Sequence, residues 1–196
     1  MIPKYCPQCA GPLEERRLRD EQLPQPVCTR CGRVLWQNPK PTASGLITRQ
    51  QRRRGPVEVL LVRRARPPRQ GCWDCPGGYV DPDEHPEDAL RRELREELGV
   101  RATIGALVGI YMDRYGDEGE STLNIYYRVP TITGTPTAAS DVGTASWFRL
   151  DHLPDPLAFG NNRRALHALA RVLAGEGTGT PREQSRVLKH GRGRRG

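Results

Sequence analysis

Hydrophobic and polar positions follow two different periods along this chain of 196 residues, and the shorter period predicts strands. Residues 42–48 and 57–63 are rich in β-branched and aliphatic side chains, and the charged stretch 49–55 between them predicts a hairpin. Similar runs predict further strands at residues 104–111, 122–129 and 146–150, with a Gly/Asp/Glu turn at 116–119 joining the first two. The chain is therefore expected to build a sheet.

Two segments carry the longer, helical period instead. Residues 86–98 start with a proline suited to the first helical position, continue with two acidic residues and stop before Gly99. Leu90, Leu94 and Leu98 form an apolar stripe that can anchor this helix to a sheet. A second amphipathic helix is expected at 162–173. Strands interspersed with two helices predict an α/β domain.

Six cysteines occur as three C-x-x-C pairs, and the first two pairs predict a metal site. Cys6/Cys9 and Cys28/Cys31 are separated by eighteen residues, a zinc-ribbon spacing, and each pair is followed by a glycine. About forty residues bury too little to fold alone, so zinc would supply the folding energy. A redox dithiol or two disulfides are the alternatives, and the spacing favours zinc within residues 1–37.

The third pair, Cys72 and Cys75, has no partner pair. In an extended segment these two positions point to opposite faces. Cys75 is expected to act as a small buried hydrophobe and Cys72 to carry no role.

The net charge of +8 raises the question of a nucleic-acid partner. Half of that charge lies in residues 175–196, which hold almost no apolar residues and are expected to form a basic disordered tail. A nucleic-acid partner is thus admitted but not favoured. No run is long enough for a membrane span and the N-terminus lacks an apolar signal region, which predicts a cytoplasmic protein.

Three glutamates crowd one face of the first predicted helix. Glu93, Glu96 and Glu97 are spaced i, i+3, i+4 and share an arc of about 100°. Hard divalent cations prefer carboxylate oxygens, so Mg²⁺ or Mn²⁺ would relieve the repulsion. From the helix alone, a solvated acidic face paired with nearby arginines is the alternative.

The surrounding segment resembles the Nudix box, G-x5-E-x7-R-E-U-x-E-E-x-G-U, where U is aliphatic. Every specified position matches: Gly78, Glu84, Arg92, Glu93, Leu94, Glu96, Glu97, Gly99 and Val100. The resemblance extends to Trp73 with Pro76-Gly77-Gly78, and to a ribbon-bearing branch of the family at the N-terminus. It implies a Nudix α/β/α sandwich with a mixed sheet over residues 38–174, preceded by a small zinc ribbon.

The resemblance also implies an activity: metal-dependent hydrolysis of a nucleoside diphosphate linked to another moiety. Glu96 and Glu97 would be the firmest Mg²⁺ or Mn²⁺ ligands, and Glu93 a further ligand or the general base. Arg92 would orient a glutamate by bidentate pairing. Glu84 would stabilise the loop or the metal's surroundings.

Further substrate contacts are nominated outside the box helix. Gly77 and Gly78 would let the backbone approach a ligand, and Asp141 is a candidate acidic ligand or base, with a loop cap as its alternative. Glu118 and Glu120 are weaker candidates. The candidate stacking surfaces are Tyr79, Trp36 and Phe159.

FAD and ADP-ribose are the favoured substrates, with FAD placed ahead of ADP-ribose because residues 156–159 resemble branch members that hydrolyse FAD or related dinucleotides. The NADH-specific element after the box is absent, so NADH, like a free dNTP, is an alternative. Another is a zinc-ribbon nucleic-acid-binding or RNA-end-processing protein that uses the Nudix domain as a sensor. Because many members of the family dimerise, a homodimer is one expected assembly.

Overall fold

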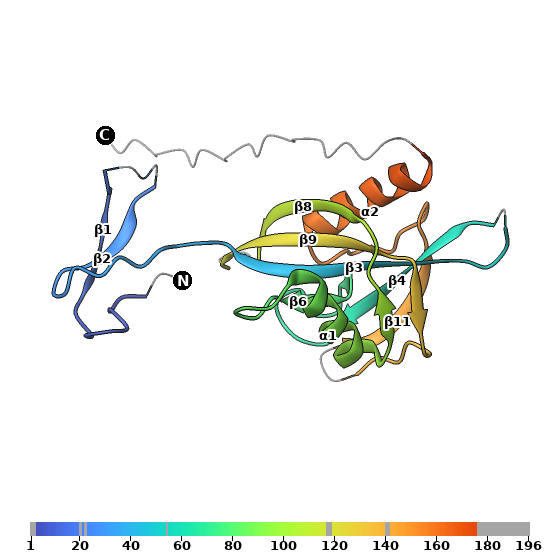
Figure 1. The fold of residues 1–196 in the computed structure, drawn as a ribbon, viewed down its shortest axis with the longest axis horizontal. Coiled ribbons are helices and arrows are strands. Elements are labelled where there is room, and N and C mark those ends of the chain that lie inside the picture. The colour runs from blue at the N-terminus through green and yellow to red at the C-terminus, as the bar shows by residue number, and fades with distance from the viewer. Residues whose placement is uncertain are drawn as a thin grey trace, which may run out of the picture.

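The computed structural model describes residues 3–19, 21, 23–53, 55–116, 119–139 and 142–175. A small N-terminal module stands apart from a larger domain, and an extended segment joins the two (Figure 1). The module contains one antiparallel pair, β1 (Leu13–Arg16) and β2 (Gln25–Cys28). The predicted tail lies outside the described residues from 176 onward.

The larger domain is built on a mixed sheet of seven strands. Its main path runs β11-β4-β3-β9-β8, in which β3 and β9 are parallel and the other neighbours are antiparallel. The short strands β5 and β6 pair with β4 and β3. The seven strands are β3 (Lys40–Gln50), β4 (Val57–Arg64), β5 (Trp73–Asp74), β6 (Gly77–Tyr79), β8 (Leu107–Arg114), β9 (Ser121–Val129) and β11 (Val142–Arg149).

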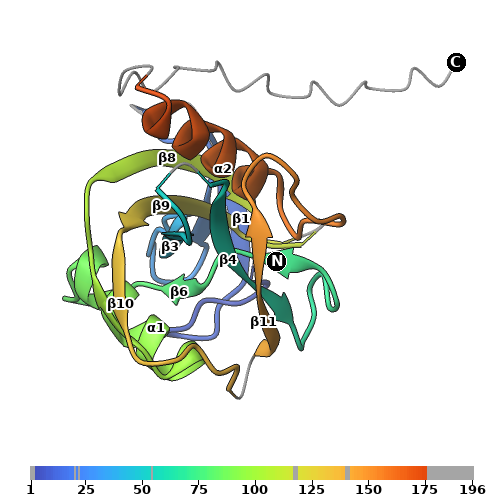
Figure 2. The ribbon, with the colours of Figure 1, turned by 90° about the vertical axis from the view of Figure 1, so that its right-hand side faces the viewer.

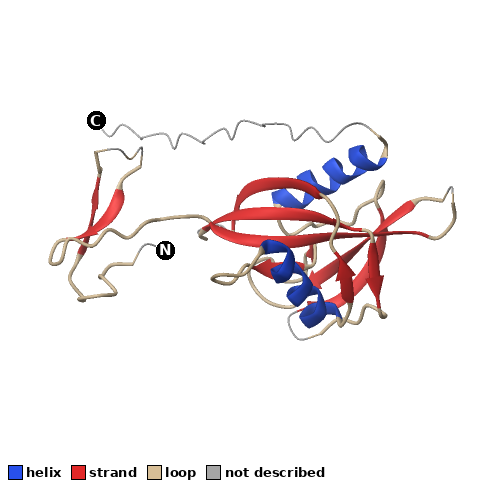
Figure 3. Cartoon of the chain, viewed as in Figure 1, coloured by secondary structure: helices blue, strands red, loops and turns tan. Residues whose placement is uncertain are grey.

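Two helices cover opposite faces of this sheet (Figures 2 and 3). Helix α1 (Pro86–Leu98) inserts its fully buried leucine stripe against Ala43 and Ile47 of β3. Helix α2 (Gly160–Leu173) packs Leu166 and Leu169 into a second cluster around Leu46 and Tyr126. The fold is the expected α/β/α sandwich.

Local chemistry sets both ends of α1 where the sequence predicts them. The Nδ1 atom of His85 accepts a hydrogen bond from the Glu87 backbone N–H, and Pro86 opens the first turn. Gly99 ends the helix in the left-handed conformation at φ 68°. Because both ends depend on neighbouring residues, the sequence alone is enough to place them.

Two strand predictions are wrong at their starts. The strand predicted at 104–111 begins only at Leu107, in β8, and the residues before the predicted start form a separate strand, β7 (Arg101–Thr103), which pairs with β10 (Thr131–Thr133) in another sheet. The Gly105 N–H donates to the Arg128 carbonyl as the chain crosses between the sheets. The strand predicted at 146–150 begins four residues earlier, because residues 142–145 pair with the end of β4 despite their small and polar side chains.

The second helix also starts earlier than predicted. It begins at Gly160, where the Asp113 carboxylate from β8 accepts the Asn161 N–H at 2.9 Å. Among the described residues no helix has the length and apolar character needed to cross a membrane.

Candidate active site

A cavity of about 400 Å³ lies in the larger domain between the start of α2, the inner side of α1 and the strands between them. Two groups of side chains in its lining stand out. The acidic group is Glu93 and Glu97 of α1, and the second group is Arg64, Tyr115 and Phe159. These two groups, with the residues that hold them, make up the candidate site.

Glu97 is the more deeply buried of the two carboxylates. Its Oε2 accepts the Gly77 backbone N–H at 2.9 Å. Burial raises its pKa to about 8, and the nearby Glu93 and Asp74 charges act in the same direction. Such a carboxylate is destabilised in its charged form and would gain from a cation beside it.

Glu93 occupies the space that a side chain at residue 78 would fill. A Cβ placed on Gly78 would overlap the Glu93 carboxylate, and one placed on Gly77 would collide with the Ala43 carbonyl on β3. Burial also raises the pKa of Glu93, although Arg92 opposes the shift. The two glycines therefore allow strand β6 to lie directly against a buried carboxylate.

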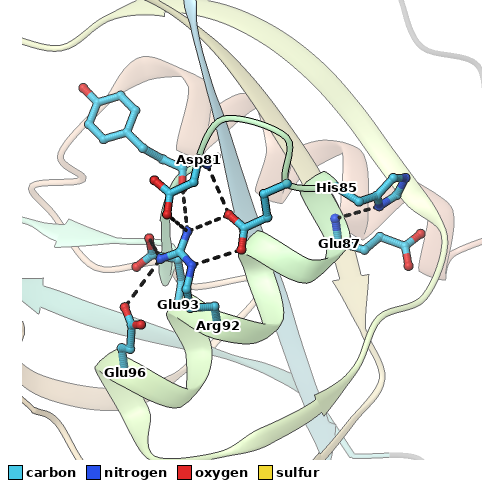
Figure 4. Close-up of polar contacts among 8 residues, drawn as sticks. Asp81, His85, Glu87, Arg92, Glu93 and Glu96 are labelled. Atoms are coloured by element: carbon cyan, nitrogen blue, oxygen red, sulfur yellow. Dashed lines mark hydrogen bonds and ion pairs between the residues drawn. The ribbon is translucent and has the colours of Figure 1, made fainter.

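Arg92 orders the loop in front of this carboxylate (Figure 4). It pairs with both oxygens of Glu84 at 3.0 and 2.9 Å, which is the expected bidentate contact. Its Nη1 reaches Glu93 Oε1 at 2.8 Å, and its Nη2 also donates to the Tyr79 carbonyl. Glu84 in turn accepts the Asp81 N–H, so the Nudix-box loop is fixed to the helix.

Glu96 differs from the other two glutamates. Its side chain is 58% exposed and contacts Arg92 at 3.5 Å, and it lies outside the cavity lining. The structure thus brings two of the three predicted carboxylates onto the cavity wall and leaves Glu96 at the rim.

The wall that contains the second group is aromatic and carries a positive charge. Tyr115 stacks on Phe159 with 5.7 Å between the ring centroids, and Tyr79 meets Tyr115 edge-on at 5.9 Å. The Arg64 guanidinium lies 5.4 and 5.2 Å from the Tyr115 and Phe159 centroids. Two of the three nominated stacking residues, Tyr79 and Phe159, therefore lie in this wall.

Other nominated residues lie elsewhere. Trp36 is 55% exposed in the segment joining the module to β3, and it is absent from the cavity lining. Glu120 forms an exposed ion pair with Lys40. Asp141 and Glu118 lie outside the described residues. Cys75 is buried, as expected, and lines the cavity.

Sequence reasoning missed several residues of the cavity: Arg64, Asp74, Tyr115, Asn161 and Asn162. Asp74 stands between Trp73 and Cys75 in a segment expected to be buried, and a charge there is a signal that could have been used. Asn161 is 3% exposed, and its buried Oδ1 has no hydrogen-bond partner among the described residues. An unpaired buried acceptor beside a cavity suits a ligand that donates a hydrogen bond.

The four N-terminal cysteines form a second candidate site. Their sulfurs all lie within 4.8 Å of one another, with Cys6 to Cys31 at 3.8 Å and Cys9 to Cys28 at 3.5 Å. The backbone N–H groups of Cys31 and Arg30 lower the pKa of Cys28 to about 6. Four thiols in this arrangement suit a tetrahedral zinc ion.

Comparisons with known proteins agree with both sites. The model of the NUDIX domain matches residues 38–169, and that of the Nudix N-terminal zinc ribbon matches residues 4–37. The chain is 30% identical to an ADP-ribose pyrophosphatase of Methanocaldococcus jannaschii over 129 residues, covering 66% of this chain and 72% of that protein.

Two further proteins are similar over the larger domain. A putative 8-oxo-dGTP diphosphatase 2 of Mycobacterium tuberculosis is 39% identical over 122 residues, which cover 60% of this chain and 82% of that one. The crystal structure of a MutT NUDIX hydrolase from Burkholderia pseudomallei is 31% identical, with a TM-score of 0.60, covering 67% of this chain and 98% of that chain.

Proposed function

The chain belongs to the Nudix family as a pyrophosphohydrolase with an N-terminal zinc ribbon, and we propose that it hydrolyses a nucleoside diphosphate linked to another moiety. The reaction would release two monophosphates and depend on Mg²⁺ or Mn²⁺. The observation that carries this proposal is one cavity lined both by the partly buried carboxylates of Glu93 and Glu97 and by an arginine and aromatic rings. The carboxylates suit a cation, the arginine suits a phosphate, and the aromatic rings suit a nucleobase.

The donor set fits a hard divalent cation. Glu97 would hold it from the cavity wall and the exposed Glu96 from outside that wall, while Glu93 is kept for proton transfer. The pKa values of Glu93 and Glu97 are both raised by burial, which gives a physical reason, since a bound cation offsets the cost of two neighbouring, partly buried charges. When bound, the cation would neutralise phosphate charge and acidify a bound water.

The protein's own groups would position and deprotonate the water. Arg92 holds one oxygen of Glu93 at 2.8 Å, which leaves the other oxygen to accept a proton. A carboxylate whose pKa is raised by burial is better matched to proton transfer near neutral pH. Glu93 is therefore the proposed general base, and Arg92 and Glu84 are its positioning residues.

ADP-ribose is the first candidate substrate, ahead of FAD. Both contain a diphosphate and an adenine, which suit the two groups in the cavity lining. The M. jannaschii relative is named as an ADP-ribose pyrophosphatase, which favours ADP-ribose over FAD.

A substrate panel tests the proposal. Purified protein with Mg²⁺ or Mn²⁺ is incubated with ADP-ribose, FAD, NADH, Ap4A and dNTPs, and the products are separated by chromatography. We expect AMP and ribose 5-phosphate from ADP-ribose. Hydrolysis of none of these compounds, or unchanged hydrolysis by Glu96→Gln/Glu97→Gln, would contradict the catalytic proposal.

A nucleoside triphosphate is the second candidate. The M. tuberculosis relative is named a putative 8-oxo-dGTP diphosphatase. The unpaired Asn161 Oδ1 would accept a hydrogen bond from a nucleobase N–H. In the panel this alternative predicts preferred hydrolysis of a dNTP to its monophosphate and pyrophosphate.

A further inference from the structure

The guanidinium of Arg64 donates three hydrogen bonds to other parts of the protein. Its Nε donates to the Pro68 carbonyl at 2.8 Å, its Nη1 to Asp74 Oδ2 at 2.9 Å and its Nη2 to the Tyr115 hydroxyl at 2.7 Å. A guanidinium has five N–H groups, so each terminal nitrogen keeps one N–H beyond these contacts. The side chain is 17% exposed and lines the cavity.

Asp74 holds this guanidinium from a short strand that is itself anchored on both sides. Residue 74 pairs with Val62 of β4, two residues before Arg64. Its other oxygen, Oδ1, accepts a hydrogen bond from Asn162 Nδ2 at 2.7 Å, and Asn162 Oδ1 accepts the Tyr126 hydroxyl at 2.6 Å. A buried chain of hydrogen bonds thus ties Arg64 to the sheet and to α2.

The same short strand also places the aromatic surface beneath the guanidinium. The Trp73 N–H donates to the Pro156 carbonyl, and the Ala158 N–H donates to the Trp73 carbonyl. These two hydrogen bonds hold residues 156–158 beside β5. They bring Phe159, the residue just before α2, against the Arg64 guanidinium. Strand β5 therefore fixes the Arg64 guanidinium in two ways: Asp74 hydrogen-bonds to its edge, and the segment held beside β5 places the Phe159 ring against its face.

We propose that Asp74, supported by Asn162, is a positioning residue that aims Arg64 at a phosphate of the substrate in the cavity that Glu93 and Glu97 also line. The inference rests on the proposed function. Both Asp74 oxygens already have protein partners, so Asp74 acts through Arg64 and is not a further cation ligand. A fixed guanidinium donor binds phosphate oxygens more strongly than a mobile one, because less side-chain freedom is lost on binding.

Steady-state kinetics with ADP-ribose test the proposal on the full chain. We expect Arg64→Ala to raise KM by about tenfold or more, since a charge-assisted hydrogen bond is lost. Asp74→Asn should raise KM by roughly three- to tenfold with little change in kcat or in the Mg²⁺ concentration that half-saturates the reaction. In the Arg64→Ala background, Asp74→Asn should raise KM further by less than about twofold.

Two controls separate positioning from folding. Glu58→Gln breaks another arginine–carboxylate pair between neighbouring strands, with Arg49, outside the cavity, and should leave KM unchanged. Thermal unfolding of each variant reports any loss of structure. If Asp74→Asn fails to fold, Arg64→Lys carries the test: it keeps the charge but cannot make the three contacts, so KM should still rise.

Titration calorimetry with ADP keeps this inference separate from the proposed function. If no substrate in the panel is hydrolysed, the function fails, yet weaker ADP binding by Asp74→Asn would still support the positioning role. Equal ADP affinity in wild type and Asp74→Asn, or no ADP binding by the wild type, would overturn it. So would a fall in kcat with a shifted Mg²⁺ requirement, since that result would place Asp74 at the cation.

Discussion

The two candidate metal sites of this chain are built in opposite ways. Among the described residues, the four cysteines are the one group of potential ligands gathered closely enough to hold a metal ion. The box glutamates are spread instead, with Glu97 bonded to a backbone N–H, Glu93 to Arg92, and Glu96 at the rim. A closed set of ligands suits a structural ion, and an open set suits an ion that must also meet substrate.

The surroundings of the two sites also differ, in how much hydrophobic core supports each one. In its described residues, the module that carries the cysteines has two short strands and little apolar burial beyond Val27 and the cysteines Cys6 and Cys28. The larger domain buries two hydrophobic clusters, and it can tolerate two carboxylates in an unfavourable position. One metal would therefore replace a core, whereas the other would use the stability that a core provides.

The largest effect should come from Glu97→Gln. Loss of a cation ligand is expected to lower kcat by about two to four orders of magnitude. The same variant should raise the melting temperature of the metal-free protein at pH 8, because it removes a buried charge. Glu87→Gln, which alters only a half-exposed pair with Arg91, is the matched control for both measurements.

If Glu97→Gln is inactive but less stable than wild type in metal-free buffer, the carboxylate is not held at a cost in stability. The contrast between the two sites would then lose its energetic basis.

The second prediction concerns the cysteine site. Cys28→Ser should reduce bound zinc from about one equivalent to a small fraction and unfold residues 4–37, as measured by metal analysis and hydrogen exchange. The larger domain should keep its protection because its clusters contain no residue of the module. Cys72→Ser is the control, and zinc loss in that variant would contradict the assignment of the ligands.

The third prediction tests the close contact beneath Glu93. Gly78→Ala places a methyl group where the Glu93 carboxylate lies, so kcat should fall by roughly tenfold or more. Gly143→Ala is the control, since its added Cβ meets the Arg63 carbonyl at an ordinary 3.7 Å. Equal activity of the two variants would show that the position of Glu93 is not set by the glycine.

The last prediction is a pH dependence of stability, which is small over any single pH unit. The pKa of Glu97 rises from 4.5 to about 8 on folding, so between these values the folded protein binds more protons than the unfolded chain. Its contribution therefore lowers stability as pH rises through this window, by at most about 1.4 kcal/mol per pH unit.

Denaturant unfolding of metal-free protein at pH 5, 6.5 and 8 measures this slope. Glu97→Gln should flatten it, and added Mg²⁺ should weaken it. A wild-type slope of the opposite sign that Glu97→Gln removes would contradict the burial argument.

The parts that sequence predicts well are those set by near neighbours. Both ends of α1 follow from Pro86 and Gly99, and the stripe of leucines follows from the helical period. The cysteine spacing likewise predicts the cluster, because each C-x-x-C pair is a local turn. Local chemistry is readable from a single sequence.

The remainder depends on contacts between distant residues. Helix α2 starts at Gly160 because Asp113, almost fifty residues earlier, accepts the backbone N–H of Asn161 in its first turn. The two-residue strand β5 has no periodicity to detect, yet it joins Arg64 to Asn162 through Asp74. Pattern reasoning has no access to such pairs, which is why it found the box glutamates and two of the aromatic residues of the cavity but missed Arg64 and Asp74.

The most direct test follows zinc and activity on one sample. Purified protein is passed by gel filtration into metal-free buffer, and hydrolysis of the preferred substrate and bound zinc are measured before and after Mg²⁺ is returned. We predict that activity falls to background and recovers with Mg²⁺ while zinc stays near one equivalent. Full activity without Mg²⁺, or recovery that requires zinc instead, would contradict the division between a permanent structural ion and an exchangeable catalytic one.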